Sequence, residues 1–204
     1  MELRRLTDRE LIPWYEQELT EAFPPNERKP FGDILALMDQ GRYEVWGLFE
    51  GEALLGYATL WMEPADKSCI LLDYLGVTAA RRNGGLGRRI VTMLAEQLAG
   101  KSLLLIEAER PVEGDDLAEN ALRQRRLRFY ERCGFVPAYD MATCGMRFTT
   151  FLPERPADLA PVMALHKAIY GPVRTDVKVP LGPDELPPGP PAWMEKGETE
   201  WSVC

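Results

Sequence analysis

The feature that most constrains this chain is a strand, a glycine-rich turn and a helix in direct succession between Leu71 and Ala95. The apolar run Cys69–Val77 predicts a buried strand, and residues 90–98 carry apolar side chains at helical spacing. The glycines stand where the helix must begin. Because the first N–H groups of a helix lack intrahelical partners and carry partial positive charge, a loop without side chains there can wrap a phosphate closely.

Two nucleotide-binding motifs do not fit this turn. The pattern G-x-G-x-x-G fails because Ile90 stands where a third glycine would follow Gly85 and Gly87. The phosphate loop G-x-x-x-x-G-K-[ST] fails because Arg88 and Arg89 follow Gly87. A Gly-Gly pair between a strand and a helix is also an ordinary tight connection, so the turn alone leaves a phosphate cradle and a plain turn both open.

The pattern that remains is R-x-x-G-x-G, spelled by residues 82–87 and preceded by Leu-Gly-Val at the strand end. It resembles motif A of the GNAT superfamily of acyl-CoA-dependent N-acetyltransferases. The resemblance implies that backbone amides from Asn83 to Arg88 hold the coenzyme A pyrophosphate. The residues it assigns to coenzyme binding are Leu75, Gly76, Val77, Arg82, Asn83, Gly84, Gly85, Leu86, Gly87 and Arg88.

A second element, Y-x-x-x-G-F, is spelled by Tyr130, Gly134 and Phe135 and resembles an element of the same superfamily. The resemblance covers roughly residues 1–152, and two elements at a compatible separation are more specific than either one. It implies transfer of an acetyl group from the cosubstrate acetyl-CoA to a primary amine by direct attack, without an acyl-enzyme. The alternative is an acyl-CoA-binding sensor or regulatory domain without turnover.

The resemblance also implies roles in the chemical step. Tyr130 stands at the family's position for a general acid that protonates the coenzyme thiolate, and the Val77 amide is a candidate to polarise the thioester carbonyl. From helical periodicity alone, an aromatic residue at this place is more often part of the core. Gly76 suits a close approach of ligand and backbone, although glycine within a strand can equally mark a bulge.

Three carboxylates are candidates for the general base. Asp73 interrupts an otherwise apolar strand, where burial would disfavour its charged form and prepare it to accept a proton, but it can equally face solvent. Glu107 and Glu109 share one face of a later strand, near the end expected to adjoin the site. Asp73 and Glu107 rank equally as the base, and Glu109 ranks behind them.

Composition narrows the class of protein. At 204 residues, with 46% hydrophobic and 27% charged residues, the chain fits one soluble domain, and it lacks an apolar run long enough to span a bilayer. The start lacks a signal-peptide core, which favours the cytoplasm. A formal charge of −8 argues against nucleic-acid binding and suits a cationic amine acceptor. The scattered cysteines and single histidine suggest neither a metal site nor disulfides.

The order of the predicted elements is that of an α+β fold, a GNAT-like, mostly antiparallel mixed sheet of six to seven strands flanked by helices. The predicted strands are Met1–Leu6, Tyr43–Phe49, Ala53–Met62, Cys69–Val77, Ser102–Glu109, Val136–Tyr139 and Met146–Leu152. The predicted helices are one after Thr7 that starts or kinks near Pro13, Phe31–Asp39, the helix after the glycine loop, Leu117–Arg132, and one within Pro156–Tyr170.

These elements predict a GNAT-like domain over residues 1–152, a C-terminal helix packed on it over 153–171, and a proline-rich tail over 172–204. The acceptor is a small-molecule or peptide amine of open identity, and a monomer and a homodimer both remain open. By the family's layout Trp14, Phe23 and Trp46 can line the acceptor pocket, although core packing is the default for such residues. Cys133 and His166 are assigned packing or surface positions without a catalytic role.

Overall fold

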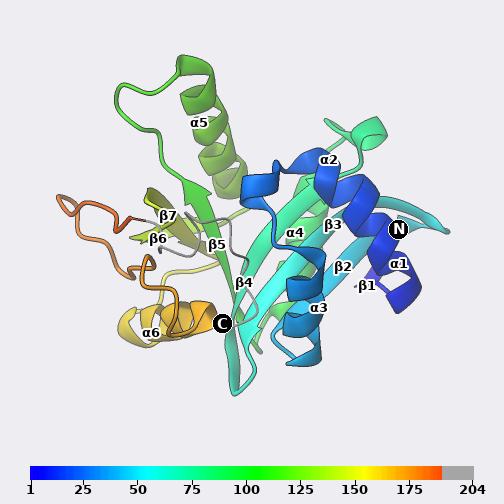
Figure 1. Cartoon of the computed structure of the whole chain (residues 1–204), viewed down its shortest axis with the longest axis horizontal. Coiled ribbons are helices and arrows are strands. Elements are labelled where there is room, and N and C mark those ends of the chain that lie inside the picture. Colours follow the sequence, from blue (N-terminus) through cyan, green and yellow to red (C-terminus); the bar gives the residue numbers. More distant parts are fainter. Residues whose placement is uncertain (190–204) are drawn as a thin grey trace.

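The structure is a computed structural model that describes residues 1–189, apart from the side chain of Asn26. Its centre is a seven-stranded sheet in the order β1-β2-β3-β4-β5-β7-β6, shown in Figure 1. Only β4 and β5 run parallel, and the other neighbouring strands are antiparallel. The strands are β1 Glu2–Arg5, β2 Tyr43–Glu50, β3 Ala53–Glu63, β4 Asp66–Val77, β5 Leu103–Glu109, β6 Val136–Thr143 and β7 Met146–Leu152. This confirms the expected α+β sheet.

Helices cover both faces of the sheet. They are α1 Asp8–Pro13, the π-helix η1 Trp14–Leu19, α2 Thr20–Ala22, α3 Phe31–Asp39, α4 Leu86–Leu98, α5 Leu117–Arg132 and α6 Ala160–Tyr170, with 3-10 turns η2 Pro25–Glu27 and η3 Ala79–Arg81. In Figure 1, α1 to α3 lie in front of the sheet and α4 lies behind it. One apolar cluster joins the front helices and α6 to the sheet, and a second joins α4 and α5 to the other face.

The first helical segment changes its pitch at Pro13. Thr7 begins it, and the Thr7 N–H donates to Glu10 Oε2 at 2.8 Å, which satisfies one of the free donors at this helix start. Pro13 has no N–H for the α-helical ladder, and the π-helix Trp14–Leu19 follows it directly. The wider turn places both Trp14 and Leu19 in the core. The expected kink near Pro13 is therefore present as a π-helical segment.

β4 and β5 pair over only part of their length. The pairs run from Cys69 with Leu103 to Leu72 with Ile106, after which β5 continues along β7 and β4 continues along β3. In Figure 1 the two strands diverge beyond this point. Within residues 1–189, the last five residues of β4, 73–77, thus have β3 on one side and no strand partner on the other.

A bulge accompanies this divergence. Leu60 pairs with Leu72 and Ala58 with Leu75, so Thr59 of β3 faces two β4 residues, Asp73 and Tyr74. The extra residue puts both of these side chains on the face covered by α1 to α3, where the strict alternation of a regular strand would separate them. Local sequence does not predict this bulge.

Beyond α6 the chain lies along β6. Lys178 and Ala142 form an antiparallel bridge, and the Leu181 N–H donates to the Asp140 carbonyl at 2.8 Å. Arg147 Nη2 donates to the Gly182 carbonyl at 3.0 Å. β6 itself extends four residues beyond the predicted Val136–Tyr139 because residues 140–143 pair with residues 146–149 of β7. The division into residues 1–152, 153–171 and 172–204 stays a prediction, and residues 190–204 of the tail lie outside the described residues.

Candidate active site

The glycine loop presents backbone donors at the start of α4. Asn83 and Gly85 adopt left-handed conformations with φ of 65° and 77°, and Gly85 is the N-cap of the helix. The first α4 hydrogen bond runs from the Arg89 N–H to the Gly85 carbonyl at 3.1 Å. The N–H groups of residues 86–88 therefore precede the helical ladder and point outward, which is the geometry of an anion site.

Exposed arginines surround the loop. Arg82 Nη2 lies 3.1 Å from Glu21 Oε1 of the helix α2, and its Nε donates to the Val77 carbonyl at 3.3 Å. Arg125 of α5 reaches the Asn83 side-chain oxygen at 3.5 Å. These cations give the loop a local positive charge although the chain as a whole carries −8.

The free edge of β4 offers two further amides. The Tyr74 N–H donates to Thr59 Oγ1 at 2.9 Å and the Thr78 N–H to the Leu55 carbonyl at 3.1 Å, so these donors face β3. Because backbone N–H groups alternate sides along a strand, the Leu75 and Val77 amides face the other way, toward the side that β5 has left. The Val77 amide thus faces the side of β4 that β5 has left, and its role as carbonyl polariser stays a prediction.

Gly76 owes its lack of a side chain to packing. A Cβ there would lie 2.2 Å from Cζ of Tyr57 on β3, a distance that real side chains do not adopt. Tyr57 is itself 1% exposed and packs edge-on against Trp14 with ring centroids 5.7 Å apart. The Tyr57 ring on the neighbouring strand is thus sufficient to explain the glycine at position 76, without a ligand or a bulge.

Tyr130 lies on α5 beside the apolar cluster of the α4 face. Its ring is 5.0 Å from that of Phe129 and 6.1 Å from that of Phe151. Burial raises its pKa to about 12, against an opposing effect of the Arg126 charge. Within residues 1–189 the Tyr130 hydroxyl makes no hydrogen bond. Its predicted role as an acid remains a prediction, and the geometry leaves its proton available.

Asp73 meets a lysine that sequence analysis did not single out. Lys29 Nζ lies 2.8 and 2.7 Å from its two carboxylate oxygens, and the Tyr43 hydroxyl also donates to Asp73. The same hydroxyl lies 2.8 Å from Thr59 Oγ1 at the bulge. Asp73 therefore faces neither solvent nor an empty apolar space, since it is bonded to an ammonium group.

Glu107 is bonded to the C-terminal helix. Its carboxylate lies 2.6 Å from Nε2 of His166 and accepts from the Tyr170 hydroxyl at 2.9 and 2.7 Å, while Nδ1 of His166 lies 2.9 Å from the Tyr139 hydroxyl. His166 is fully buried, so of the two positions expected for it, surface and packing, the structure has the packing position. This network explains why α6 carries a histidine among apolar residues.

The remaining predicted residues are spread over both faces. Glu109 is 2.7 Å from Arg123 of α5 and so belongs to a surface network. Trp14 and Phe23 lie on the face that carries Asp73, and Phe23 packs against Tyr74 at 4.9 Å. Trp46 packs on the opposite face. The residues that the sequence analysis missed are Lys29, Tyr43, Tyr139 and Tyr170; no local pattern marks them.

The fold and this edge of β4 can now be compared with known proteins. The family model "Acetyltransferase (GNAT) domain" matches residues 41–137, which span β2 to the start of β6 and include the divergence, the glycine loop and Tyr130. Residues 41–137 therefore match a GNAT acetyltransferase domain. The putative acetyltransferase YjbC of Bacillus subtilis (strain 168) is 34% identical over 125 residues, which are 61% of this chain and 57% of YjbC.

Solved GNAT structures share the fold. A GNAT-family protein from Bacteroides thetaiotaomicron superposes with a TM-score of 0.63 at 23% identity, over 84% of this chain and 99% of that one. An aminoglycoside 6'-N-acetyltransferase complexed with coenzyme A superposes with a TM-score of 0.58 at 14% identity, over 78% of this chain and 100% of that one. At these identities the likeness establishes the architecture and leaves the acceptor open.

Two features are absent from residues 1–189. Within that range, no helix has both the length and the apolar character needed to cross a membrane. The same residues contain no group of three or more His, Cys, Asp or Glu side chains placed to hold a metal ion.

Proposed function

We propose that this protein transfers an acetyl group from acetyl-CoA to a primary amine by direct attack. The observation that carries the proposal is the edge of β4 beyond Leu72, which loses its β5 partner and leads directly into the glycine loop. A thioester along that edge would lie beside the Leu75 and Val77 amides, with its pyrophosphate at the start of α4. Coenzyme A in the similarly folded aminoglycoside 6'-N-acetyltransferase, and acetyl-CoA with yncA of Salmonella typhimurium, support this cosubstrate.

The step itself needs few groups. The neutral amine nitrogen attacks the acetyl carbonyl carbon, the carbon–sulfur bond breaks, and coenzyme A leaves as a thiolate. Backbone amides stabilise the negative charge on the carbonyl oxygen in the transition state. We assign the proton for the thiolate to the Tyr130 hydroxyl, whose pKa of about 12 keeps it protonated at neutral pH.

For the amine's proton we favour Asp73 and retain Glu107 as the second candidate. Asp73 already accepts hydrogen bonds from an ammonium group, that of Lys29. Glu107 is bonded to His166 and Tyr170, which suits a residue that positions β5 against α6. Both carboxylates stand at the point where the two strands part, since Leu72 and Ile106 form the last pair.

Two measurements test this function. Acetyl-CoA at 100 times its Kd should stabilise the native protein by about 2.7 kcal/mol, which appears as a raised Tm. Thioester consumption with pooled alkylamines, polyamines, aminoglycosides and lysine peptides should then reveal turnover. Stabilisation without turnover of any amine would refute acetyl transfer and favour the acyl-CoA-binding sensor, while absence of stabilisation would refute both.

A further inference from the structure

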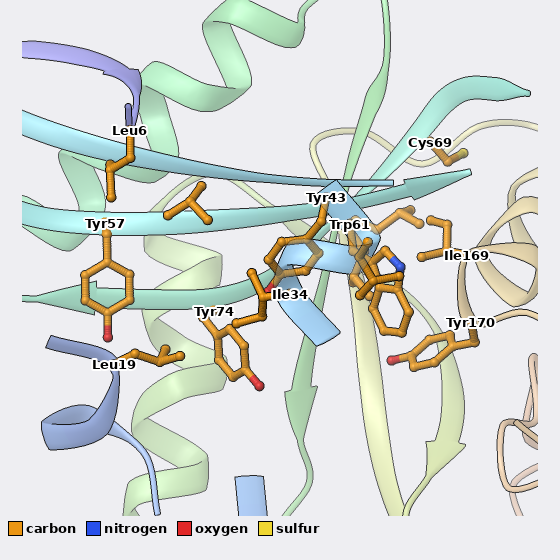
Figure 2. Close-up of a cluster of buried hydrophobic side chains, with 14 of the residues drawn as sticks. Leu6, Leu19, Ile34, Tyr43, Tyr57, Trp61, Cys69, Tyr74, Ile169 and Tyr170 are labelled. Atoms are coloured by element: carbon orange, nitrogen blue, oxygen red, sulfur yellow. The ribbon is translucent and has the colours of Figure 1, made fainter. Parts of the chain in front are cut away.

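Among residues 1–189, one carboxylate and three aromatic rings form a cage around the Lys29 ammonium. Its Nζ lies 2.8 and 2.7 Å from the Asp73 oxygens, and 4.3, 5.2 and 5.7 Å from the ring centroids of Trp61, Tyr74 and Tyr43. The Lys29 side chain is 3% exposed. Figure 2 shows Tyr43, Trp61 and Tyr74 gathered on one face of the sheet, with Tyr170 beside Trp61.

This set of groups has the chemistry of a binding site for an alkylammonium ion. Ring faces attract a cation through their quadrupoles, most strongly when water is excluded, and a carboxylate accepts its N–H donors. The rings come from three neighbouring strands, and the β4 bulge brings Tyr74 to the same face as Asp73. The cage is therefore formed by strands of the sheet, whereas its occupant, Lys29, belongs to a segment outside the sheet.

The occupant comes from the connection between α2 and α3. Three hydrogen bonds hold this segment at the cage. The Lys29 N–H donates to the Tyr74 hydroxyl at 2.9 Å, that hydroxyl donates to the Glu27 carbonyl at 2.9 Å, and the Tyr15 hydroxyl donates to the Lys29 carbonyl at 3.1 Å. A short 3-10 turn, Pro25–Glu27, is its one regular element between α2 and α3. Withdrawal of the Lys29 side chain would thus leave every strand and helix of the core intact.

The cage also adjoins the proposed reaction edge. Asp73 is the first β4 residue after the last pair with β5, and it precedes by two residues Leu75, whose amide faces the unpaired side. A nitrogen held by Asp73 would lie next to the segment along which we place the thioester. An ammonium site far from this edge could not place its nitrogen near the thioester.

We propose that the cage of Asp73, Tyr43, Trp61 and Tyr74 is the ammonium pocket for the acceptor, and that Lys29 is an internal occupant which the acceptor displaces. This rests on the proposed function. The ligand class is an unhindered primary ammonium on an aliphatic stem, as in an alkylamine, a polyamine or a lysine side chain. After displacement, Asp73 takes one ammonium proton and the neutral nitrogen attacks the thioester carbon as the carbon–sulfur bond breaks. The departing thiolate receives the Tyr130 proton, and the second proton of the former ammonium leaves the new amide nitrogen and returns through solvent to the tyrosinate.

A purely structural ion pair makes a different prediction. If Lys29 only anchors its segment, removing it costs stability and gives no advantage to any amine. If Lys29 occupies the acceptor pocket, removing it opens a site whose missing atoms are those of n-propylammonium, since alanine retains Cβ alone. The same variant therefore separates the two interpretations.

The experiment adds n-propylammonium to Lys29→Ala without acetyl-CoA. We expect a saturable rise in Tm of about 4 °C or more, no rise with the neutral isostere n-propanol, and no rise in Lys29→Ala/Asp73→Asn. With acetyl-CoA present, we expect KM for primary alkylamines to fall about tenfold relative to wild type. The matched control Lys67→Ala, at an exposed lysine, should leave KM unchanged.

Absence of the propylammonium effect, or an unchanged or higher KM in Lys29→Ala, would overturn the proposal. If Lys29→Ala folds only with the added ion, that rescue itself supports the pocket. Lys29→Gln serves as a second variant, because its uncharged amide can still donate to Asp73, and its KM should also fall. Propylammonium stabilisation without turnover of any amine would refute acetyl transfer while leaving the ammonium pocket standing, so the two failures are distinguishable.

Discussion

The proposed coenzyme side and the proposed acceptor side of the β4 edge use different chemical groups. The coenzyme side consists of backbone groups, the amides of residues 75, 77 and 86–88, with exposed arginines around them. The acceptor side consists of buried side chains in pairs, Lys29 with Asp73 and Glu107 with His166. A backbone site tolerates loss of a side chain, whereas loss of one member of a buried pair leaves the other without its counter-charge. The predictions below test this contrast.

The largest effect is expected at Asp176, which helps to hold the C-terminal segment beside the acceptor face. Arg174 Nε lies 2.9 Å from its Oδ1, and the Cys144 N–H donates to its Oδ2 at 2.8 Å. Asp176→Asn removes the carboxylate that pairs with the buried Arg174 guanidinium, which costs about 3–5 kcal/mol of unfolding free energy, or roughly 6–20 °C in Tm. Glu185→Gln in the same segment, at an exposed pair with Lys178, should cost less than about 1 kcal/mol in the same thermal melts.

The Asp176 effect should also depend on pH. Burial opposes ionisation of Asp176, but the hydrogen bonds and charge of Arg174 outweigh burial and lower the carboxyl pKa. A group with a lowered folded-state pKa contributes stability above its unfolded pKa, about 3.9, and loses it as the pH falls through the folded value. The difference in unfolding free energy between wild type and Asp176→Asn should therefore be constant from pH 7 to 5 and shrink below pH 4. A difference that grows in acid would contradict the assignment.

The next largest effect concerns Tyr130, the one side chain that we assign to proton transfer on the coenzyme side. Tyr130→Phe should lower kcat about 100-fold, while the acetyl-CoA Kd and the Tm stay near wild type because the ring packing remains. With a pKa of about 12, the wild-type acid stays protonated, so kcat should show no alkaline decline from Tyr130 up to pH 10. Cys133→Ala, one turn away, is the matched control and should retain kcat. Equal kcat in Tyr130→Phe and wild type would remove this role.

The difference between contiguous backbone groups and paired side chains also explains how much of the site could be predicted from the sequence. The coenzyme side is contiguous along the chain, so residues 82–88 and Tyr130 are readable as motifs. Helix α5 also begins and ends where expected, because the Asp116 side chain caps the Ala118 N–H at 2.8 Å and Gly134 with φ of 92° ends the helix. These signals act over a few residues.

The acceptor side could not be predicted in this way. Lys29 and Asp73 are 44 residues apart, and Glu107 and Tyr170 are 63 apart. Each pair forms only after the sheet, its bulge and α6 are in place, and no spacing rule connects such residues.

Gly76 is closely packed against the Tyr57 ring, at the β4 edge between the proposed coenzyme and acceptor sides. Gly76→Ala puts a Cβ 2.2 Å from the Tyr57 ring, so overpacking should cost about 1–3 kcal/mol of unfolding free energy. Combining it with Tyr57→Leu should recover part of that loss relative to the sum of the two single variants, as a double-mutant cycle in urea would measure. Additive losses would show that the backbone, not the Tyr57 ring, requires glycine here.

The smallest effect is expected at Gly85, where open space surrounds the Cα but the backbone is left-handed. A Cβ there meets nothing within 4 Å, so Gly85→Ala should cost only the strain of φ 77°, about 1 kcal/mol, or a Tm loss of about 2–4 °C. Gly85→Asn should lose less, because asparagine tolerates this conformation. If the coenzyme side depends on backbone direction, the acetyl-CoA Kd should rise more for alanine than for asparagine. A Kd that instead follows side-chain size would mean that contact with the Cβ, and not the amide orientation of the loop, governs coenzyme binding.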